Sequence, residues 1–200
     1  MIHSTLGKQL FEQALRSARA ADKSGGEYPV ALLEQAARAG HPDALYALAN
    51  WHIHGKGVRR SYKKAVALLK RAAAMKVAPA MYDLAVSYEL GKGTAKDTHA
   101  ALLWYRRAAR AGDLDGQRET ARCYYHGIGT EPSPKRALKW YRAAAERGDA
   151  ESQYVVGRAF EMGEGVRRSL PLAIDWYRRA AAQGEPNARR TLSELAEDRS

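Results

Sequence analysis

Two short glycine–lysine–glycine runs, at residues 55–57 and 91–93, contain residue types that bind phosphate in other proteins. In a phosphate loop, glycine backbone amides and a lysine surround the phosphates, and the loop joins a strand to a helix. Neither run completes the G-x-x-x-x-G-K-S/T pattern or follows a strand-like segment. We therefore interpret both runs as turns, and we predict no nucleotide cofactor.

The histidines, the cysteine and the carboxylates show no spacing that indicates catalysis or metal binding. His52 and His54 are two residues apart, so on one helix they point to different faces and cannot bind one metal ion. Cys123 belongs to an expected helix that ends near His126, where the imidazole is not placed to activate the thiol. We expect Cys123 to be a half-buried structural residue. The sequence predicts no catalytic residues, no metal site, no cofactor and no enzyme activity.

The elements that must position these side chains repeat every 36 residues. Each repeat contains a glycine pair, an alanine-rich segment and a closing glycine, which Lys76 replaces in the first repeat. The periodicity is that of two helices, as in residues 80–90 and 98–111, and the glycine pair ends the first of them. Helices this short are marginal alone, so stacking must stabilise them. The four full repeats cover residues 41–76, 77–112, 113–148 and 149–184.

The chain divides into a central array and two atypical ends. Residues 1–40 are predicted to form an N-terminal helix and a degenerate capping repeat. Residues 41–184 hold the four full repeats, and residues 185–200 are predicted to be a C-terminal capping helix. Atypical terminal repeats are expected because the ends of a stack must cover its apolar face.

The repeated columns resemble the Sel-one-like repeat, a relative of the tetratricopeptide repeat, over residues 28–198. The last full repeat carries VGRAFEMGEGV at 156–166 and AIDWYRRAAAQG at 173–184, which follow the family's pattern closely. Leu68 and Leu69 depart from it by replacing the tryptophan–tyrosine pair. The resemblance implies an all-α fold, a right-handed α-solenoid of helix–turn–helix repeats whose first helices line a concave groove. It also implies scaffolding work like that of bacterial adaptor proteins.

The tetratricopeptide architecture places the positions beside the core stripe of each first helix in this groove. Here these positions vary from repeat to repeat, whereas the glycine and alanine columns do not. Tyrosine and arginine are frequent among them and are enriched at binding hot spots. The predicted partner-binding residues are Tyr46, Asn50, Tyr82, Glu89, Arg118, Arg122, Tyr125, Tyr154, Arg158 and Glu161.

The formal net charge of +11 raises nucleic acid or an anionic membrane as a second class of partner. Much of the charge lies in basic residues of the second helices, which we expect to form a solvated outer face. Nucleic-acid binding would need interleaved aromatic residues, and none accompany these positions. This basic ladder comprises Lys70, Arg71, Arg106, Arg107, Arg142, Arg178 and Arg179.

The sequence favours a non-catalytic scaffold or adaptor that binds a protein or peptide with acidic groups in the concave groove. A narrower form of this hypothesis is a bacterial regulator or a toxin-neutralising partner. The alternative is a binder of anionic surfaces, nucleic acid or lipid, through the basic ladder. Charges interrupt every apolar run, so we expect no membrane span and a cytoplasmic chain, or a periplasmic one if a leader was removed. The oligomeric state stays open.

Overall fold

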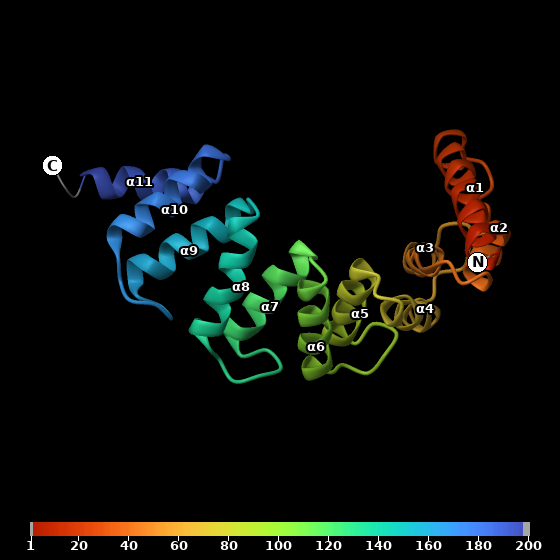
Figure 1. Cartoon of the computed structure of the whole chain (residues 1–200), viewed down its shortest axis with the longest axis horizontal. Coiled ribbons are helices and arrows are strands. Elements are labelled where there is room, and N and C mark those ends of the chain that lie inside the picture. Colours follow the sequence, from red (N-terminus) through yellow and green to blue (C-terminus); the bar gives the residue numbers. More distant parts are fainter. Residues whose placement is uncertain (1, 198–200) are drawn as a thin grey trace. The chain divides into compact units, whose positions relative to one another are not determined.

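The computed structural model describes residues 2–197, which contain helices and no strand. The helices form two compact units, Met1–Ala111 and Gly112–Ser200, here called unit 1 and unit 2. Figure 1 labels the helices along the chain. Unit 1 holds α1 (Ile2–Ser24), α2 (Val30–Arg38), α3 (Pro42–His54), α4 (Tyr62–Ala74), α5 (Ala78–Leu90) and α6 (Thr98–Arg110). Unit 2 holds α7 (Leu114–His126), α8 (Pro134–Glu146), α9 (Ala150–Met162), α10 (Leu170–Ala182) and α11 (Pro186–Glu197).

The helices pair into hairpins with the predicted period. The first helices α3, α5, α7 and α9 and the second helices α4, α6, α8 and α10 each have 13 residues. The predicted all-α fold class of helix–turn–helix repeats is therefore confirmed. The boundary between the units falls inside the four full repeats, and the capping roles of residues 1–40 and 185–200 stay predictions. No described helix is both long and apolar enough to cross a membrane.

One backbone hydrogen bond closes the loop of every full hairpin. The residue before each second helix donates its N–H to the carbonyl of an aromatic residue near the end of the first helix. This residue is a serine or aspartate, and in three hairpins its side chain also caps the second helix by accepting an N–H bond. The backbone bonds join Ser61 to His52, Asp97 to Tyr88, Ser133 to Tyr124 and Ser169 to Phe160, over 2.7–2.9 Å.

The two glycines of each turn have different physical roles. The first glycine, such as Gly91, adopts φ +69° and ends its helix in the left-handed conformation. The second, such as Gly93, lies against the preceding repeat: a Cβ atom there would be 2.3 Å from the carbonyl oxygen of Tyr62, the first residue of α4. In unit 2 the same approach places Gly165 against the backbone of Pro134 at the start of α8. The interpretation of these runs as turns is confirmed, and the second glycine joins neighbouring repeats.

Small and aliphatic side chains form the core of each unit. In unit 1 the alanines at the helix crossings have no exposed surface, and Leu33, Leu45, Leu69 and Leu84 fill the space between them. In unit 2, Val156 and Tyr177 are fully buried. Cys123 is also completely buried, so its prediction as half-buried was wrong. It lies seven residues after Gly116, on the same buried stripe of α7 as Thr120, where helical periodicity turns it inward.

We expect Gly93→Ala to destabilise unit 1 more than Gly40→Ala. Both residues have positive φ, +77° and +83°, so alanine is strained at either position. A Cβ at Gly40 meets open space, and its cost should be about 1 kcal/mol. A Cβ at Gly93 also meets backbone that cannot move aside, which should raise the loss in unfolding free energy to about 3 kcal/mol. Denaturant unfolding followed by circular dichroism measures the unfolding free energy of both variants. Equal losses would contradict the role of Gly93 in joining neighbouring repeats.

Candidate functional site

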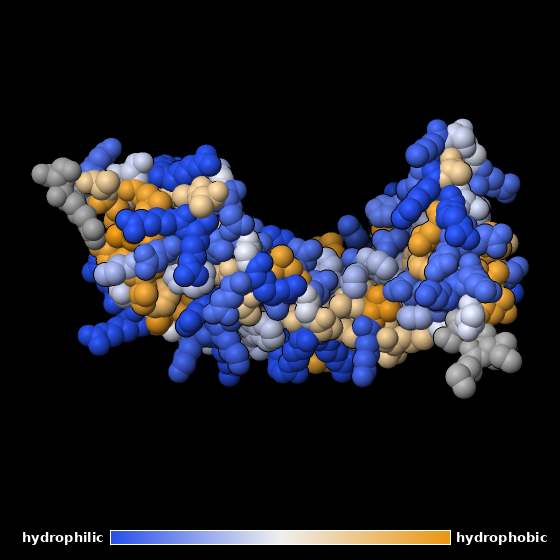
Figure 2. All heavy atoms as spheres, turned by 45° about the horizontal axis from the view of Figure 1, so that its top comes forward, coloured by the Kyte–Doolittle hydropathy of each residue, from blue (hydrophilic) through white to orange (hydrophobic). Residues whose placement is uncertain are grey.

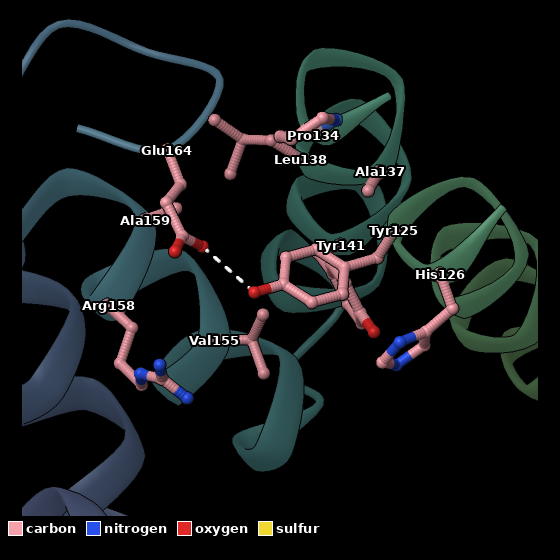
Figure 3. A pocket seen from close by; sticks show the side chains of 10 residues that line it. All are labelled: Tyr125, His126, Pro134, Ala137, Leu138, Tyr141, Val155, Arg158, Ala159 and Glu164. Atoms are coloured by element: carbon pink, nitrogen blue, oxygen red, sulfur yellow. Dashed lines mark hydrogen bonds between the residues drawn. The ribbon is translucent and has the colours of Figure 1, made fainter. Parts of the chain in front are cut away.

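Each unit has a pocket between two successive first helices, and the start of the intervening second helix contributes to its lining. The unit 1 pocket, about 450 Å³, lies among α3, α4 and α5. The unit 2 pocket, about 260 Å³, lies among α7, α8 and α9 (Figure 3). Asn50, Ile53, His54, Arg60, Tyr62, Asp83, Val86, Ser87 and Lys92 line the first pocket. Tyr125, His126, Pro134, Ala137, Leu138, Tyr141, Val155, Arg158, Ala159 and Glu164 line the second.

The two pockets occupy the same place in the repeat. Every residue of the unit 1 pocket except Asn50 and Arg60 has a counterpart two 36-residue periods later that lines the unit 2 pocket. His54 corresponds to His126, whereas Val86 corresponds to Arg158 and Lys92 to Glu164. The repeat geometry therefore builds the pocket, and the individual sequence of each repeat determines its chemistry.

Tyr125 spans the unit 2 pocket. Its hydroxyl donates to the Glu164 carboxylate over 3.2 Å, and its ring lies 5.0 Å from that of His126, edge to face. Figure 3 shows the Tyr125 side chain directed across the pocket towards Glu164, with Arg158 on the α9 side. Leu138 and Val155 are among its apolar lining residues. The pocket thus offers an apolar interior with a cation and a carboxylate among its lining residues.

A tyrosine–glutamate hydrogen bond ties the first helix to the second in two repeats. Tyr105 donates to Glu89 over 2.7 Å, and Tyr177 donates to Glu161 over 2.5 Å. The Tyr105 and Tyr177 side chains are almost completely buried. Burial raises the pKa of Tyr177 far above its usual value, and the hydrogen bond to Glu161 adds to that shift. Tyr177 therefore remains a protonated donor throughout the physiological range.

The repeat of α7 and α8 lacks this bond. Its tyrosine is present as Tyr141, but Tyr125 occupies the glutamate position and turns to Glu164 instead. Among the described residues, no hydrogen bond reaches the Tyr141 hydroxyl, which belongs to the pocket lining. Burial, with smaller contributions from Glu151 and Glu119, raises the pKa of Tyr141 to about 12.

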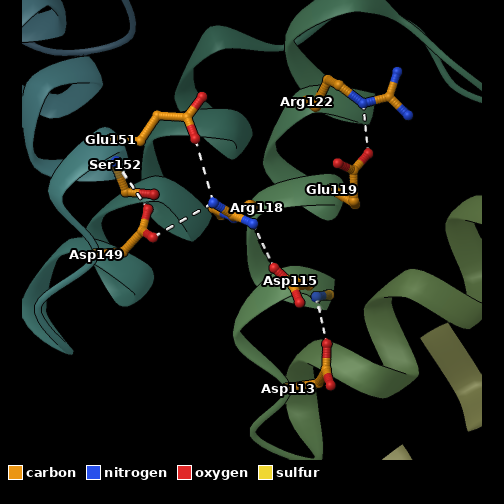
Figure 4. Close-up of polar contacts among 9 residues, drawn as sticks. Asp113, Asp115, Arg118, Glu119, Arg122, Asp149, Glu151 and Ser152 are labelled. Atoms are coloured by element: carbon orange, nitrogen blue, oxygen red, sulfur yellow. Dashed lines mark hydrogen bonds and ion pairs between the residues drawn. The ribbon is translucent and has the colours of Figure 1, made fainter. Parts of the chain in front are cut away.

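Arg118 and Arg122 are neutralised by neighbouring carboxylates (Figure 4). Arg118 pairs with Asp115 on its own helix and, over 3.6 and 3.2 Å, with Asp149 and Glu151 at the start of α9. Burial opposes the charged form of Arg118, but the three carboxylates outweigh it and raise its pKa. Arg122 Nε pairs with Glu119 over 2.5 Å. These arginines connect or brace helices of unit 2.

The predicted partner-binding residues therefore have several different environments. Asn50, Tyr125 and Arg158 line the pockets. The others contact neighbouring side chains or backbone of their own unit. Glu89 and Glu161 accept hydrogen bonds from tyrosine hydroxyls, and Arg118 and Arg122 form ion pairs. Tyr82 and Tyr154 pack on Tyr105 and Tyr177 with ring centroids 5.6 and 5.5 Å apart, and the Tyr46 carbonyl accepts from the Asn50 side chain. A role of any of them in partner binding stays a prediction.

Sequence reasoning missed several lining residues. Lys92 and Glu164 lie between the two glycines of a turn, and Arg60 lies in the loop before a second helix. The signal that could have found Lys92 and Glu164 is that the residue between two unvarying glycines changes along the chain, from lysine in the first two full repeats to isoleucine and then glutamate. Among the described residues, no group of three or more histidine, cysteine or acidic side chains could hold a metal ion.

The basic ladder is exposed except for the half-buried Arg106, and part of it stacks on aromatic rings. The expectation that no aromatic residues accompany the ladder was therefore wrong, because tryptophans one helical turn before two of its arginines turn to the same side. Arg107 lies over Trp104 at 4.4 Å and Arg179 over Trp176 at 4.7 Å, each measured to the ring centroid. Figure 2 shows hydrophilic side chains over most of the face drawn in each unit, with apolar patches between them. Cations stacked in this way cover aromatic surface as well as carrying charge.

Helical hairpins of constant period, joined through glycine turns, place the chain among the α-solenoid repeat proteins. The sequence model of the Sel1 repeat matches residues 30–41, 42–77, 78–113, 114–149 and 150–185. The chain belongs to the Sel1 repeat family, as the sequence predicted. Members of this family are generally non-catalytic and commonly act as scaffolds for protein–protein interactions.

Solved structures of the same kind come from several bacteria. A protective antigen of uropathogenic Escherichia coli with an SLR fold matches with TM-score 0.79 and 28% identity, over 83% of this chain and 36% of its own. A Sel1 repeat protein from Oxalobacter formigenes matches with TM-score 0.76 and 31% identity, over 83% and 48%. The chain thus spans less than half the length of these two relatives. An immunity protein of Pseudomonas aeruginosa shares the fold, with TM-score 0.50 and 24% identity over 88% and 67%. None of the curated proteins compared matches the chain.

Tyr177→Phe and Tyr141→Phe should differ in their effect on stability. The first removes the donor to Glu161 in a fully buried setting, and we expect a loss of about 2 kcal/mol in unfolding free energy. The second removes a hydroxyl without a partner among the described residues, so its cost should stay below about 0.5 kcal/mol. Urea unfolding of the two variants makes the comparison. A larger loss for Tyr141→Phe would show that its hydroxyl is bonded in solution.

Tyr141 should titrate late in the folded chain. Its pKa of about 12 lies above the ordinary tyrosine value, so both folded and unfolded chains are protonated below about pH 10. Between about pH 10 and about pH 12 the unfolded chain loses this proton first, and the contribution of Tyr141 to folding stability falls. The difference in tyrosinate absorbance between wild type and Tyr141→Phe isolates this residue. A midpoint near the ordinary value would contradict its burial.

Proposed function

We propose that this chain is a non-catalytic scaffold that binds a partner protein or peptide through the pockets between successive first helices. The observation that carries the proposal is the recurrence of one pocket in both units with conserved placement and altered lining. A position that serves only the joint between repeats needs the same residue each time, as the turn glycines illustrate. A pocket that keeps its position in the repeat but differs in its lining residues can recognise a different side chain of the partner in each unit.

The family supports the same conclusion, because Sel1 repeats commonly mediate protein–protein interactions. Pockets of this kind suit anchor side chains, since concave sites with an apolar interior and a few polar groups contribute most to binding. Neutralisation of a toxin or regulation of one client would be narrower uses of the same surface, with one partner occupying both pockets.

Site-specific photocrosslinking tests the proposal. A photoreactive phenylalanine analogue replaces Val86 in the unit 1 pocket, Arg158 in the unit 2 pocket, or Arg178 on the exposed ladder as the matched control. In lysate of the source organism, we expect the same protein adduct from one or both pocket positions and none from Arg178. The identified partner, once purified, should bind Tyr125→Ala/Arg158→Ala at least about tenfold more weakly than wild type if it uses the unit 2 pocket.

Two outcomes would contradict the scaffold function. One is crosslinking to nucleic acid or lipid at Arg178 with no protein adduct at either pocket, which would favour the basic ladder. The other is a protein adduct whose yield is equal at all three positions, because a partner bound in a pocket cannot label the outer helix equally.

A further inference from the structure

The two pockets differ sharply in charge. Lys92 in the unit 1 pocket corresponds to Glu164 in unit 2, and Arg60 corresponds to Pro132. Arg60 also lines an adjoining hollow of about 390 Å³ together with Arg59 and Lys64. Four cations therefore line two depressions of unit 1 that share Arg60. Asp83 is the one carboxylate that lines either depression.

These cations lack an ion-pair partner in the part of the chain that the structure describes. Among the described residues, none of Arg59, Arg60, Lys64 and Lys92 forms an ion pair with a carboxylate. The charged group of Lys92 lies 5.9 Å from the centroid of the Tyr62 ring, over an aromatic face rather than beside an acid. Arg118 and Arg122, by contrast, are already paired with acidic residues of unit 2. In the described part of the chain, Arg60 and Lys92 thus differ from Arg118 and Arg122 in having no acidic partner.

The lining also supplies polar groups suited to an anion. The pocket includes the Asn50 amide, the His54 imidazole and the Tyr62 hydroxyl beside the two cations. An arginine can hold a carboxylate through two parallel hydrogen bonds, and a lysine adds a point charge. A single exposed ion pair contributes little, but several around one depression give electrostatic complementarity that selects partners and speeds association.

We propose that the unit 1 pocket recognises an acidic segment of a partner protein, with Arg60 and Lys92 pairing with its carboxylates. This inference rests on the proposed scaffold function and names the chemistry of one of its sites. A protein segment fits better than a nucleic acid because Arg60 and Lys92 line one pocket of about 450 Å³. A nucleic-acid backbone needs a row of cations with aromatic platforms for its bases, and Tyr62 is the one tyrosine, tryptophan or phenylalanine in the lining of this pocket.

The first test uses a short fluorescein-labelled peptide of alternating glutamate and alanine, with a glutamine–alanine peptide as its uncharged counterpart. The pocket variant is Arg60→Gln/Lys92→Gln. The control variant Arg16→Gln/Arg19→Gln removes the same charge from exposed positions of α1 in the same unit. In fluorescence anisotropy, wild type should bind the glutamate peptide and not the glutamine peptide. The pocket variant should lose at least about tenfold in affinity and the control less than about twofold.

Equal losses in the two variants would overturn the proposal, because they would show that only net charge matters. Binding of the glutamine peptide as strongly as the glutamate peptide would overturn it as well. Phosphatidylserine vesicles and single-stranded DNA provide further arms. If either binds through Arg60 and Lys92 while the glutamate peptide does not, the site recognises phosphate and the proposal fails. Circular dichroism confirms that both variants fold, as expected for exposed side chains.

The partner found by photocrosslinking separates this inference from the scaffold function. If that partner binds wild type and the Arg60→Gln/Lys92→Gln variant equally, the acidic-segment site is wrong and the scaffold function stands. If no position yields a protein adduct, the scaffold function fails independently of the peptide result. Loss of partner binding in the pocket variant, together with wild-type binding that weakens more steeply with added salt than that of the variant, supports the pairing of Arg60 and Lys92 with carboxylates.

Discussion

In both units, the turn after a first helix lies directly against the backbone at the start of the preceding second helix. Gly93 against Tyr62 and Gly165 against Pro134 approach so closely that no side chain fits between them. Helices of 13 residues are marginal in water, so their stability depends on the stack that these joints hold in register. The alanine crossings, the tyrosine–glutamate bonds and the pockets all require that register. A repeat that lost the joint would lose its pocket with it.

The same constraint explains why the fold could be predicted from the sequence in detail. A joint with fixed geometry demands glycine or alanine at fixed spacing, so the period and the helix pairs are visible in the residues themselves. Lys76 is an exception to this regularity. It adopts the left-handed conformation, at φ +65°, at a position where the other full repeats have glycine. That conformation costs a non-glycine residue about 1 kcal/mol, which the surrounding repeats outweigh.

The site was less predictable because its chemistry depends on pairing between side chains. Arg118 and Glu161 occupy the expected variable columns, yet both are already bonded within the chain. Arg118 pairs with Glu151 two helices later, and Glu161 accepts a hydrogen bond from Tyr177 on the next helix. Column position cannot reveal such pairing, since two of the three carboxylates that meet Arg118 belong to the next repeat. The cations of the unit 1 pocket come from turn and loop positions, outside the helical columns that guided the prediction. Three predicted residues line a pocket. The other lining residues could be identified only once the arrangement of the three helices around each pocket was known.

Because Cys123 is completely buried, the reactivity of its thiol reports on the opening of the helices around it in unit 2. It is the single cysteine of the chain, so any reaction of a thiol reagent with the protein reports on α7 alone. A fully buried thiol reacts only when the surrounding helices open, and the reaction rate under native conditions therefore measures the free energy of that opening. Trp51 and Trp104 lie in unit 1 and Trp140 and Trp176 in unit 2, so tryptophan fluorescence reports on both units together. A comparison of thiol reactivity with fluorescence therefore shows whether α7 opens before the chain as a whole unfolds.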